Sequence, residues 1–370
     1  MKIGYDAKRF FHNATGLGNY SRDLIRVMAQ FFPENSYFLY NYKTKKINKI
    51  ATDNQIIVEK KYQGISFLAP FWRFSSIKKQ LIDDQIDLFH GLSGEIPIGL
   101  RAKKIKSIVT IHDLIFVRYP NLYSFINRKI YFWKFHHAAK NANCVVAISE
   151  QTKRDVVHFL KIDASKIQVI YQGCAAVFKN KASETALANL KLKYNLPTNF
   201  VLNVGTIEVR KNVLSVIKAL ENTEIPLVII GKKTKYYTEI KHFLKSRKME
   251  NQVFFLENIP LPELAFFYQA ATIFVYPSVF EGFGIPIIEA LFSKTPVITS
   301  TGSCFAEAGG PDSVYIEPNN VLQLKNAVVE LWNNPSKRKL QAEKGYQFVQ
   351  KFNDEPIANQ WNALYVSLIQ

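Results

Sequence analysis

Residues 200–212 have the sequence Phe-Val-Leu-Asn-Val-Gly-Thr-Ile-Glu-Val-Arg-Lys-Asn. The first five residues form a mostly apolar run, which is typical of a strand covered by helices on both faces of a parallel sheet. Gly205 permits a tight exit from this strand, and a helical pattern follows over residues 211–221. A strand that passes through a glycine turn into a helix indicates a doubly wound α/β fold.

The same alternation of short apolar runs and amphipathic stretches continues on both sides of this segment. The strands expected before it are 2–6, 36–41, 55–59, 87–90, 107–111, 144–148 and 167–171, and those expected from it onward are 200–204, 226–230, 253–256, 272–276, 296–299 and 314–316. The helices expected between and after them are 18–31, 124–140, 150–160, 211–221, 262–270, 286–293, 321–333 and 336–350, with another after Pro356. This order predicts two Rossmann-like, doubly wound domains that face each other across a cleft.

The domain boundary is expected in the polar segment between the strands 167–171 and 200–204. We therefore predict a first domain over residues 1–175 that binds the acceptor, and a second over 176–350 that binds the donor. Residues 351–370 are predicted as a C-terminal helix that returns to the first domain.

Composition limits the class of protein. The chain has 370 residues and is 48% hydrophobic, which is enough for two cores and excludes global disorder. Its three cysteines form no C-x-x-C pair, so neither a zinc site nor a disulfide framework is indicated. No signal peptide and no membrane-spanning run of apolar residues is recognisable, so we expect a cytoplasmic protein.

The positive charge is concentrated in the first half. Residues 1–175 contain 27 Lys and Arg against 13 Asp and Glu, a net charge of +14, whereas the remainder contains 21 against 17, a net charge of +4. A basic first half indicates an anionic partner, which charge alone leaves open among nucleic acid, acidic lipid and a phosphorylated acceptor.

Arg210 and Lys211 stand near the start of an expected helix, whose free backbone N–H groups favour an anion. A planar guanidinium and a compact ammonium together suit a diphosphate. The alternative is a solvated basic pair on an exposed turn.

Residues 276–290, Tyr-Pro-Ser-Val-Phe-Glu-Gly-Phe-Gly-Ile-Pro-Ile-Ile-Glu-Ala, follow a predicted strand. Gly282 and Gly284 allow a close loop, and Glu281 lies in it, while Glu289 lies one turn into the next helix. Two carboxylates placed this way can accept hydrogen bonds from sugar hydroxyls at opposite ends of one ligand. Alternatively, Glu289 is a helix-dipole partner and Glu281 a turn residue. The small residues of the segment 300–310 either leave room for a ligand or form an ordinary loop.

These motifs, in this order, resemble those of the family 4 retaining glycosyltransferases, which have the GT-B fold. The likeness covers residues 200–318 and includes G-T-x-x-x-R-K-N at 205–212 and the two glutamates spaced as E-x7-E. It implies a nucleotide-diphosphate sugar as donor, no bound metal and no other cofactor. It also implies roles for individual residues: Arg210 and Lys211 at the diphosphate, Glu289 at the ribose, Glu281 at the transferred sugar, and Gly205, Gly282, Phe283 and Gly284 lining the donor.

The resemblance extends more weakly into the first half. Gly16, Gly18, Asn19 and Tyr20 look like the family's glycine loop near the acceptor and the donor phosphates, although a helix start capped by Asn13 or Thr15 explains the same residues. His112 follows the strand 107–111 at its carboxyl end, and the matching histidine of the family lies beside the transferred sugar. A structural histidine remains the alternative.

Two stretches mix bulky aromatic residues with cations: residues 67–79 and residues 119–140. They indicate either a contact with an acidic membrane surface that carries a lipid-linked acceptor or core-facing helices with basic outer faces. Ser149 and Thr152 are explained as a helix cap.

The sequence therefore predicts a retaining, metal-independent hexosyltransferase. It would act on a glycan or lipid-linked acceptor in bacterial surface-polysaccharide assembly, with mannose favoured as the sugar. Its expected place is the cytoplasm, with the inner face of the membrane as an open alternative. The rival functions are a nucleotide-sugar epimerase, a phosphorylase of the same fold, and a nucleic-acid-binding protein. No nucleic-acid-binding motif is recognisable, so no nucleic-acid partner is expected.

Overall fold

The computed structural model describes residues 1–42, 56–62 and 71–370. The chain divides into two compact units, one made of Met1–Gly173 and Phe352–Gln370 and the other of Cys174–Lys351. The boundaries expected from the sequence were 175/176 and 350/351, and the chain after 351 belongs to the first unit.

The first unit is built on seven parallel strands in the order β3-β2-β1-β4-β5-β6-β7. The order reverses direction at β1, so the loops after β1 and β4 leave the sheet at the point where doubly wound folds bind ligands. The strands are β1 (Lys2–Asp6), β2 (Ser36–Asn41), β3 (Ile57–Lys61), β4 (Leu88–Gly91), β5 (Lys106–Ile111), β6 (Cys144–Ala147) and β7 (Ile167–Val169).

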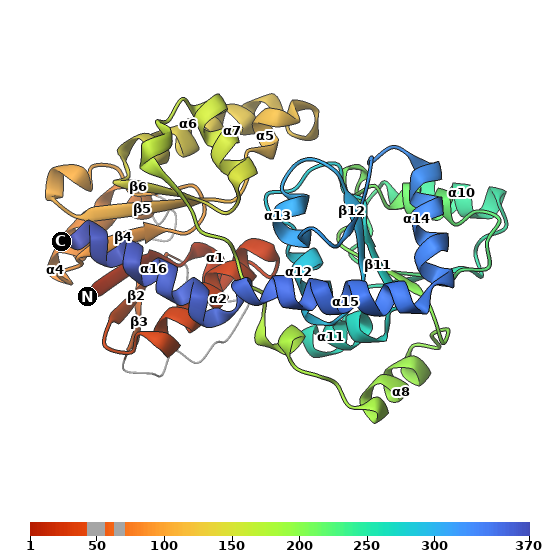
Figure 1. Ribbon diagram of the computed structural model, residues 1–370. Coiled ribbons are helices and arrows are strands. Elements are labelled where there is room, and N and C mark those ends of the chain that lie inside the picture. The colour runs from red at the N-terminus through yellow and green to blue at the C-terminus, as the bar shows by residue number, and fades with distance from the viewer. Residues whose placement is uncertain (43–55, 63–70) are drawn as a thin grey trace. The chain divides into compact units, whose positions relative to one another are not determined.

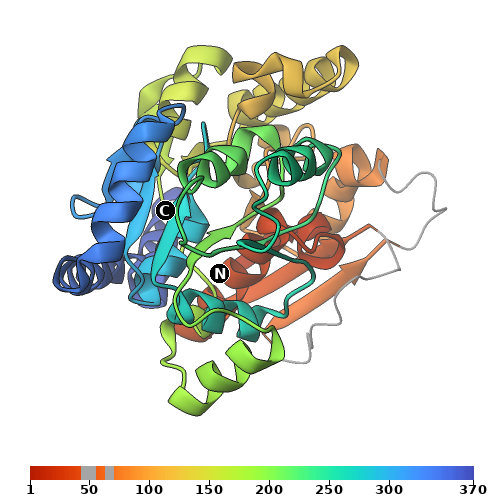
Figure 2. The same cartoon turned by 90° about the vertical axis from the view of Figure 1, so that its right-hand side faces the viewer.

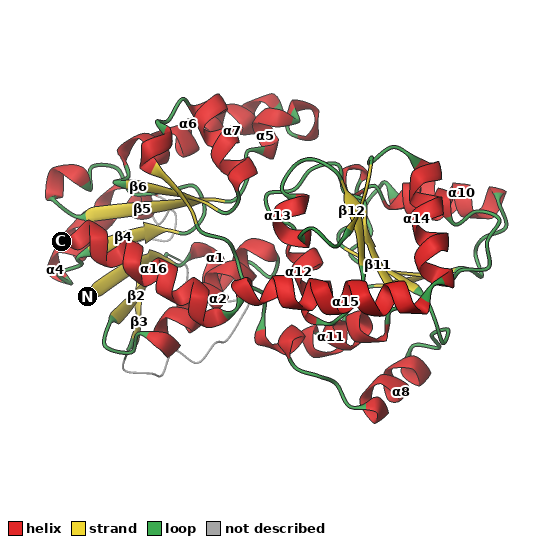
Figure 3. Ribbon diagram, in the orientation of Figure 1, coloured by secondary structure: helices red, strands yellow, loops and turns green. Residues whose placement is uncertain are grey.

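Helices cover both faces of this sheet (Figure 3). One buried cluster joins the sheet to α1, α2 and α16, and the other joins it to α4, α6 and α7. Figure 1 shows α16, the last helix of the chain, beside α2 in the first unit. The helices are α1 (Lys8–His12), α2 (Gly16–Phe31), η2 (Trp72–Ser76), α4 (Ile77–Asp83), η3 (Arg101–Lys103), α5 (Ile115–Arg118), η4 (Pro120–Leu122), α6 (Phe125–Asn141), α7 (Glu150–Leu160), η5 (Ala164–Lys166) and α16 (Asp354–Ile369).

A buried chain of hydrogen bonds fastens α16 to this sheet. The Tyr365 hydroxyl lies 3.2 Å from that of Tyr5 and 2.8 Å from His90 Nδ1, and His90 Nε2 lies 2.7 Å from the Thr110 hydroxyl. That hydroxyl lies 3.3 Å from the hydroxyl of Tyr20 on α2. Burial lowers the pKa of His90 to about 3, so the ring is neutral and can donate from one nitrogen and accept at the other.

The second unit has six parallel strands in the order β10-β9-β8-β11-β12-β13. All four residues of β8, β9, β11 and β12 are buried, as continuous apolar strands between two helical layers should be. The strands are β8 (Val201–Val204), β9 (Leu227–Ile230), β10 (Val253–Leu256), β11 (Ile273–Tyr276), β12 (Val297–Ser300) and β13 (Val314–Ile316).

In this unit α9, α10 and α14 pack on one buried cluster, and α12 contacts α11 and α15. Figure 2 shows the chain from the side of this unit. The helices are η6 (Ala176–Lys179), α8 (Glu184–Lys193), η7 (Val209–Lys211), α9 (Val213–Ala219), α10 (Tyr237–Ser246), α11 (Leu261–Ala270), α12 (Ile285–Phe292), α13 (Phe305–Gly309), α14 (Val321–Asn333), α15 (Pro335–Val349) and η8 (Gln350–Phe352).

The predicted fold class is confirmed: both sheets are parallel and doubly wound, with the predicted strands in place. The expected strand 55–59 starts at a residue outside the described ranges, and β3 occupies 57–61. The predicted helix 18–31 begins two residues earlier, so Gly16, Gly18, Asn19 and Tyr20 all lie in the first turns of α2. Their place beside the acceptor and the donor phosphates stays a prediction.

Candidate active site

The loop after β8 places both predicted cations. Gly205 has a φ of +150°, in the region that favours glycine, and Val209–Lys211 then form a single turn of 3-10 helix. Asn212 follows with a left-handed φ of 57°. Its side-chain amide donates to the backbone oxygens of Pro277 (3.2 Å) and Pro318 (2.5 Å), which belong to the loops after β11 and β13. Asn212 thus ties together three loops at the carboxyl edge of the sheet, a role the sequence analysis missed.

Both cations meet Glu281. Lys211 Nζ lies 2.6 Å and Arg210 Nη1 2.8 Å from Glu281 Oε1. The same oxygen accepts hydrogen bonds from the hydroxyls of Ser278 (2.6 Å) and Tyr276 (3.0 Å). The predicted Arg210, Lys211 and Glu281 therefore form one compact cluster, with the carboxylate at its centre.

This cluster is buried, and its charges stabilise one another. Burial alone would raise the pKa of Glu281, but the charges of Lys211 and Arg210 lower it to about 2. Burial likewise opposes the charge of Arg210, and Glu281 reverses the effect and raises the pKa of that guanidinium. The carboxylate of Glu281 and the guanidinium of Arg210 are therefore both ionised at neutral pH.

The loop around Glu281 is supported from β12. Ser303 Oγ donates to the backbone oxygen of Glu281 (3.0 Å), and Cys304 Sγ donates to that of Phe283 (2.9 Å). Gly284 has a φ of 105° and immediately precedes α12. The segment 300–310 therefore supports the loop that contains Glu281 and the predicted Gly282, Phe283 and Gly284.

Glu289 has a hydrogen-bond partner outside this cluster. It is on α12, and its Oε2 accepts a hydrogen bond of 2.8 Å from the hydroxyl of Tyr268 on α11. Burial raises the pKa of Glu289 to about 7, although the Tyr268 hydroxyl opposes the shift. The carboxyl is thus poised between its neutral and charged forms near neutral pH.

In the first unit, Asn13 fixes the start of α2. Its side-chain oxygen accepts hydrogen bonds from the backbone N–H groups of Thr15 (2.8 Å) and Gly18 (3.2 Å). A Cβ on Gly18 would lie 1.8 Å from the backbone oxygen of Asn13, whereas a Cβ on Gly16 would meet nothing within 4 Å. Only glycine therefore fits at position 18, and the cap explains this segment without reference to a ligand.

His112 is buried at the carboxyl end of β5 with both ring nitrogens engaged. Nε2 lies 2.9 Å from the backbone oxygen of Leu92, and Nδ1 lies 3.1 Å from the side-chain nitrogen of Gln172. Because the Gln172 amide can only donate to Nδ1, the proton of the neutral ring is on Nε2. Burial lowers the pKa of His112 to about 4. The ring is a fixed neutral group, which packs edge-on against Tyr20 with 4.6 Å between the centroids.

No group of three or more His, Cys, Asp or Glu side chains is placed to hold a metal ion in residues 1–42, 56–62 and 71–370. Over the same ranges, none of the helices has the length and apolar character needed to span a membrane.

The sequence matches two families that share one architecture. Residues 15–175 match Glycosyltransferase Family 4, and residues 189–348 match Glycosyl transferases group 1. These matches take in most of both units, and the chain belongs to the family 4, group 1 glycosyltransferases. It is therefore a glycosyltransferase of the GT-B type.

Individual relatives and solved structures agree with this assignment. O-antigen chain mannosyltransferase B of Escherichia coli is 23% identical over 381 residues, which cover 97% of this chain and 98% of the relative. O-antigen chain mannosyltransferase RfbU of Salmonella typhimurium is 29% identical over 229 residues, or 61% of each chain. Sucrose-phosphate synthase from Thermosynechococcus elongatus has the same fold, with a TM-score of 0.83 and 22% identity, over 100% of this chain and 99% of that one. The structure of Anabaena Alr3699/HepE, solved with UDP and glucose, has a TM-score of 0.77 and 17% identity, and the match covers 100% of both chains.

Proposed function

We propose that the protein transfers a hexose from a nucleotide-diphosphate sugar with retention at the anomeric carbon and without a metal ion. The observation that carries this proposal is the Arg210–Lys211–Glu281 cluster at the carboxyl edge of the second sheet. In that position the two cations can receive the diphosphate that departs when the sugar leaves. They would supply the charge neutralisation that a metal ion supplies in other transferases.

The contacts of Glu281 support a direct, same-face substitution over a double displacement. The nucleophile of a double displacement is a carboxylate whose negative charge is not already neutralised by bound cations. Glu281 Oε1 already accepts from two cations and two hydroxyls, so its lone pairs serve the cations. We assign Glu281 to positioning the cations and contacting the transferred sugar with its second oxygen, and the departing phosphate to accepting the proton of the acceptor.

Glu289 is assigned to the ribose of the donor. Its carboxyl is half-buried and already takes one hydroxyl hydrogen bond, from Tyr268, which is the kind of contact that a ribose would add. Gly205, Gly282, Phe283 and Gly284 would line the donor beside it. His112 would meet the transferred sugar only as a rigid neutral group, because both of its nitrogens are bound to other residues.

The relatives support the sugar and the pathway. The similar enzymes of Escherichia coli and Salmonella typhimurium are O-antigen chain mannosyltransferases, so we propose mannose as the transferred sugar and surface-polysaccharide assembly as the process. The acceptor would be a glycan or a lipid-linked glycan.

Thermal unfolding with GDP, UDP, ADP and their hexose conjugates tests the donor assignment. A nucleoside diphosphate at about 100 times its Kd should add about 2.7 kcal/mol to the stability of the folded protein. The matching donor should then transfer its sugar only when an acceptor glycan is added. Conversion of the donor sugar without an acceptor would identify an epimerase instead, and phosphate-dependent cleavage of a glycan would identify a phosphorylase. Salt-dependent DNA binding without nucleotide affinity would identify a nucleic-acid-binding protein.

An exposed aromatic surface on α6 supports a peripheral position at the cytoplasmic face of the membrane. Phe125, Ile126 and Trp133 are 65%, 70% and 51% exposed, so these side chains lie outside the core, whereas Ala138 and Ala139 at the end of α6 are buried in it. The other exposed apolar side chains next to them are Leu122, Tyr123, Ile130, Tyr131 and Phe132. In the first stretch, Trp72 is buried and residues 67–70 lie outside the described ranges.

The positive charge of this surface favours binding to a membrane that contains anionic lipid. Residues 114–149 contain five Lys and Arg and no Asp or Glu, and two of these cations, Arg118 and Lys134, form ion pairs with Asp155 and Glu95. Arg128 and Lys129 lie 5.9 Å and 5.5 Å from the centre of the Phe125 ring, so cations and apolar groups are presented together. Each cation near an acidic bilayer contributes about 1 kcal/mol, and the aromatic groups favour the headgroup region.

Flotation with vesicles of phosphatidylcholine, with and without phosphatidylglycerol, tests this contact. The protein should float with acidic vesicles at low salt, and replacing Phe125 and Ile126 by serine should abolish flotation. Leu192→Ser with Leu340→Ser is the matched control, because both leucines are exposed on the other unit. Equal flotation of both double variants, or none of the unmodified protein at low salt, would contradict the proposal.

A further inference from the structure

Two cations directly after β1 have no partner. Lys8 and Arg9 open α1 at the carboxyl edge of the first sheet. Within residues 1–42, 56–62 and 71–370, neither side chain makes a hydrogen bond or an ion pair, and the Nε of Arg9 is buried without an acceptor. A buried guanidinium nitrogen without an acceptor is costly, so its persistence needs an explanation.

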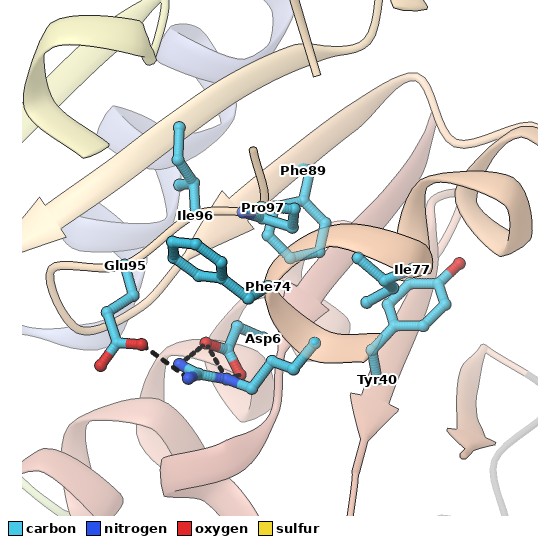
Figure 4. Close-up of a pocket in the computed structure, with 9 residues that line it drawn as sticks. Asp6, Tyr40, Phe74, Ile77, Phe89, Glu95, Ile96 and Pro97 are labelled. Carbon is cyan, nitrogen blue, oxygen red and sulfur yellow. Dashed lines mark hydrogen bonds and ion pairs between the residues drawn. The ribbon is translucent and has the colours of Figure 1, made fainter. Parts of the chain in front are cut away.

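The nearby carboxylates are already used. Asp6 and Glu95 both bind Arg73, with Asp6 Oδ1 3.0 Å from its Nε and Glu95 Oε2 2.6 Å from its Nη1 (Figure 4). Lys134 Nζ lies 3.5 Å from the same Glu95 oxygen. Lys8 also contributes to lowering the pKa of Glu95, but the four cations Arg73, Lys134, Lys8 and Arg9 outnumber these two acids. The cavity beside Arg73 has room for about one water molecule and not for a larger ligand.

Lys8 lies close to this ion-paired group, and Arg9 lies close to His112. Burial and the nearby Arg73 lower the pKa of Lys8, and the charges of Glu95 and Asp6 only partly oppose this shift. Arg9 lies near enough to His112 for its charge to add to the effect of burial on that ring. The pair therefore lies in partly desolvated surroundings at the ligand-binding edge of the sheet, where an uncompensated charge is unfavourable.

We propose that Lys8 and Arg9 bind a phosphate or diphosphate group of the acceptor substrate. A guanidinium binds phosphate oxygens as a planar fork and an ammonium as a point charge, so the two residue types suit this ligand. The proposal rests on the proposed function, in which Arg210 and Lys211 already take the diphosphate of the donor. An anion bound in the first unit then belongs to the second substrate.

Calorimetric titration of the full-length protein tests the site and its source. The protein is first saturated with the nucleoside diphosphate that stabilises it most, so that Arg210 and Lys211 are occupied. Geranyl diphosphate is then titrated as the acceptor probe, with geraniol as its uncharged counterpart. The variants are Lys8→Gln, Arg9→Gln, the double variant and the conservative Arg9→Lys. The matched control is Arg101→Gln with Lys103→Gln, which removes the same charge from two exposed cations of η3.

We expect the unmodified protein to bind geranyl diphosphate and not geraniol. Each glutamine variant should bind about tenfold more weakly, because a hydrogen bond to a charged group is lost, and the double variant about a hundredfold more weakly. Arg9→Lys should keep part of the affinity, and the control pair should stay within about twofold. Affinity for the nucleoside diphosphate should be unchanged in every variant.

Three results would overturn the proposal. They are no binding of geranyl diphosphate by the unmodified protein, equal loss in the control pair, and equal loss of nucleoside diphosphate affinity, which would assign the site to the donor. Melting of each variant shows whether it folds, and an unpaired charge predicts that the glutamine variants melt no lower than the unmodified protein. If the unmodified protein binds no nucleoside diphosphate, the proposed function is contradicted instead. This binding is measured first, before geranyl diphosphate is added.

Discussion

The substitution Glu281→Gln tests the central feature of the second unit. Glu281 is buried, and it is the carboxylate that holds Arg210 and Lys211 together. Glutamine keeps the size of the side chain and removes its charge. Both cations would then remain in partly buried positions without an acidic partner, except that Arg210 keeps its contact with Glu208.

The size of the effect follows from the pKa of Glu281. A pKa lowered from 4.5 to about 2 corresponds to about 3 kcal/mol, since one pKa unit is about 1.36 kcal/mol. This agrees with the ~3–5 kcal/mol lost when one member of a buried ion pair is removed. Because the folded pKa is depressed, the contribution is complete above the unfolded pKa of 4.5 and is lost as the pH falls through about 2.

Urea unfolding of the unmodified protein and of Glu281→Gln should therefore differ by about 3 kcal/mol at pH 7 and by only about half as much at pH 3. Hydrogen exchange of the peptide that contains β11 and α12 should place the loss in the second unit. Glu208→Gln is the control, because Glu208 lies 2.7 Å from Arg210 but its side chain is 39% exposed, so its loss should cost less than about 1 kcal/mol. A difference below 1 kcal/mol at pH 7, or one that does not change with pH, refutes the reasoning.

Three further substitutions test separate parts of the site. Lys211→Ala should lower kcat by about a hundredfold or more while the protein stays folded, since one electrostatic contact to the leaving group is worth ~2.7–4 kcal/mol. Lys218→Ala, on the exposed side of α9, is the control and should leave kcat unchanged in the same transfer assay. Glu289 has a raised pKa of about 7, so its contribution to stability falls as the pH rises from 4.5 through 7. Glu289→Gln should abolish up to about 3 kcal/mol of that fall, as measured by urea unfolding at pH 5 and at pH 8. If the stability of the variant and that of the unmodified protein change equally with pH, the raised pKa of Glu289 is excluded. Gly18→Ala should lower the melting temperature, because its Cβ meets a backbone oxygen. Gly16→Ala should leave the free energy of unfolding unchanged or raise it by up to about 1 kcal/mol, because its Cβ meets nothing. The reverse order of the two melting temperatures would contradict the packing of α2.

The sheets could be predicted because burial on both faces leaves a direct mark in the sequence. A strand such as Leu227–Ile230 is continuously apolar, and all four residues are buried. Helix starts were less certain, because they depend on capping contacts. The predicted helix 18–31 begins at Gly16, since Asn13 supplies the acceptor for the first turn from outside the apolar pattern.

The residue types of the site could be predicted, but their partners could not. Arg210 and Glu281 are 71 positions apart, and a sequence shows neither the distance between their atoms nor the fact that the carboxylate is occupied by cations. The same limit applies to His112, whose second partner Gln172 lies beyond the last strand of its sheet. The signal available for Asn212 was its place beside the two cations, but only the structure shows which loops it joins.

The two cationic pairs of the protein differ in how their charge is balanced, and this difference suggests a division of labour between the units. Arg210 and Lys211 share an internal carboxylate, so their positions are fixed before any ligand arrives, as expected of groups that must stabilise a transition state without rearranging. Lys8 and Arg9 have no such partner among the described residues, so an anion bound there would relieve an existing electrostatic cost. The fixed positions of Arg210 and Lys211 favour the chemical step. The unbalanced charge of Lys8 and Arg9 favours discrimination between charged and neutral ligands, because a neutral ligand would not relieve the electrostatic cost of that charge. We therefore expect a charged acceptor to bind more tightly than its neutral counterpart.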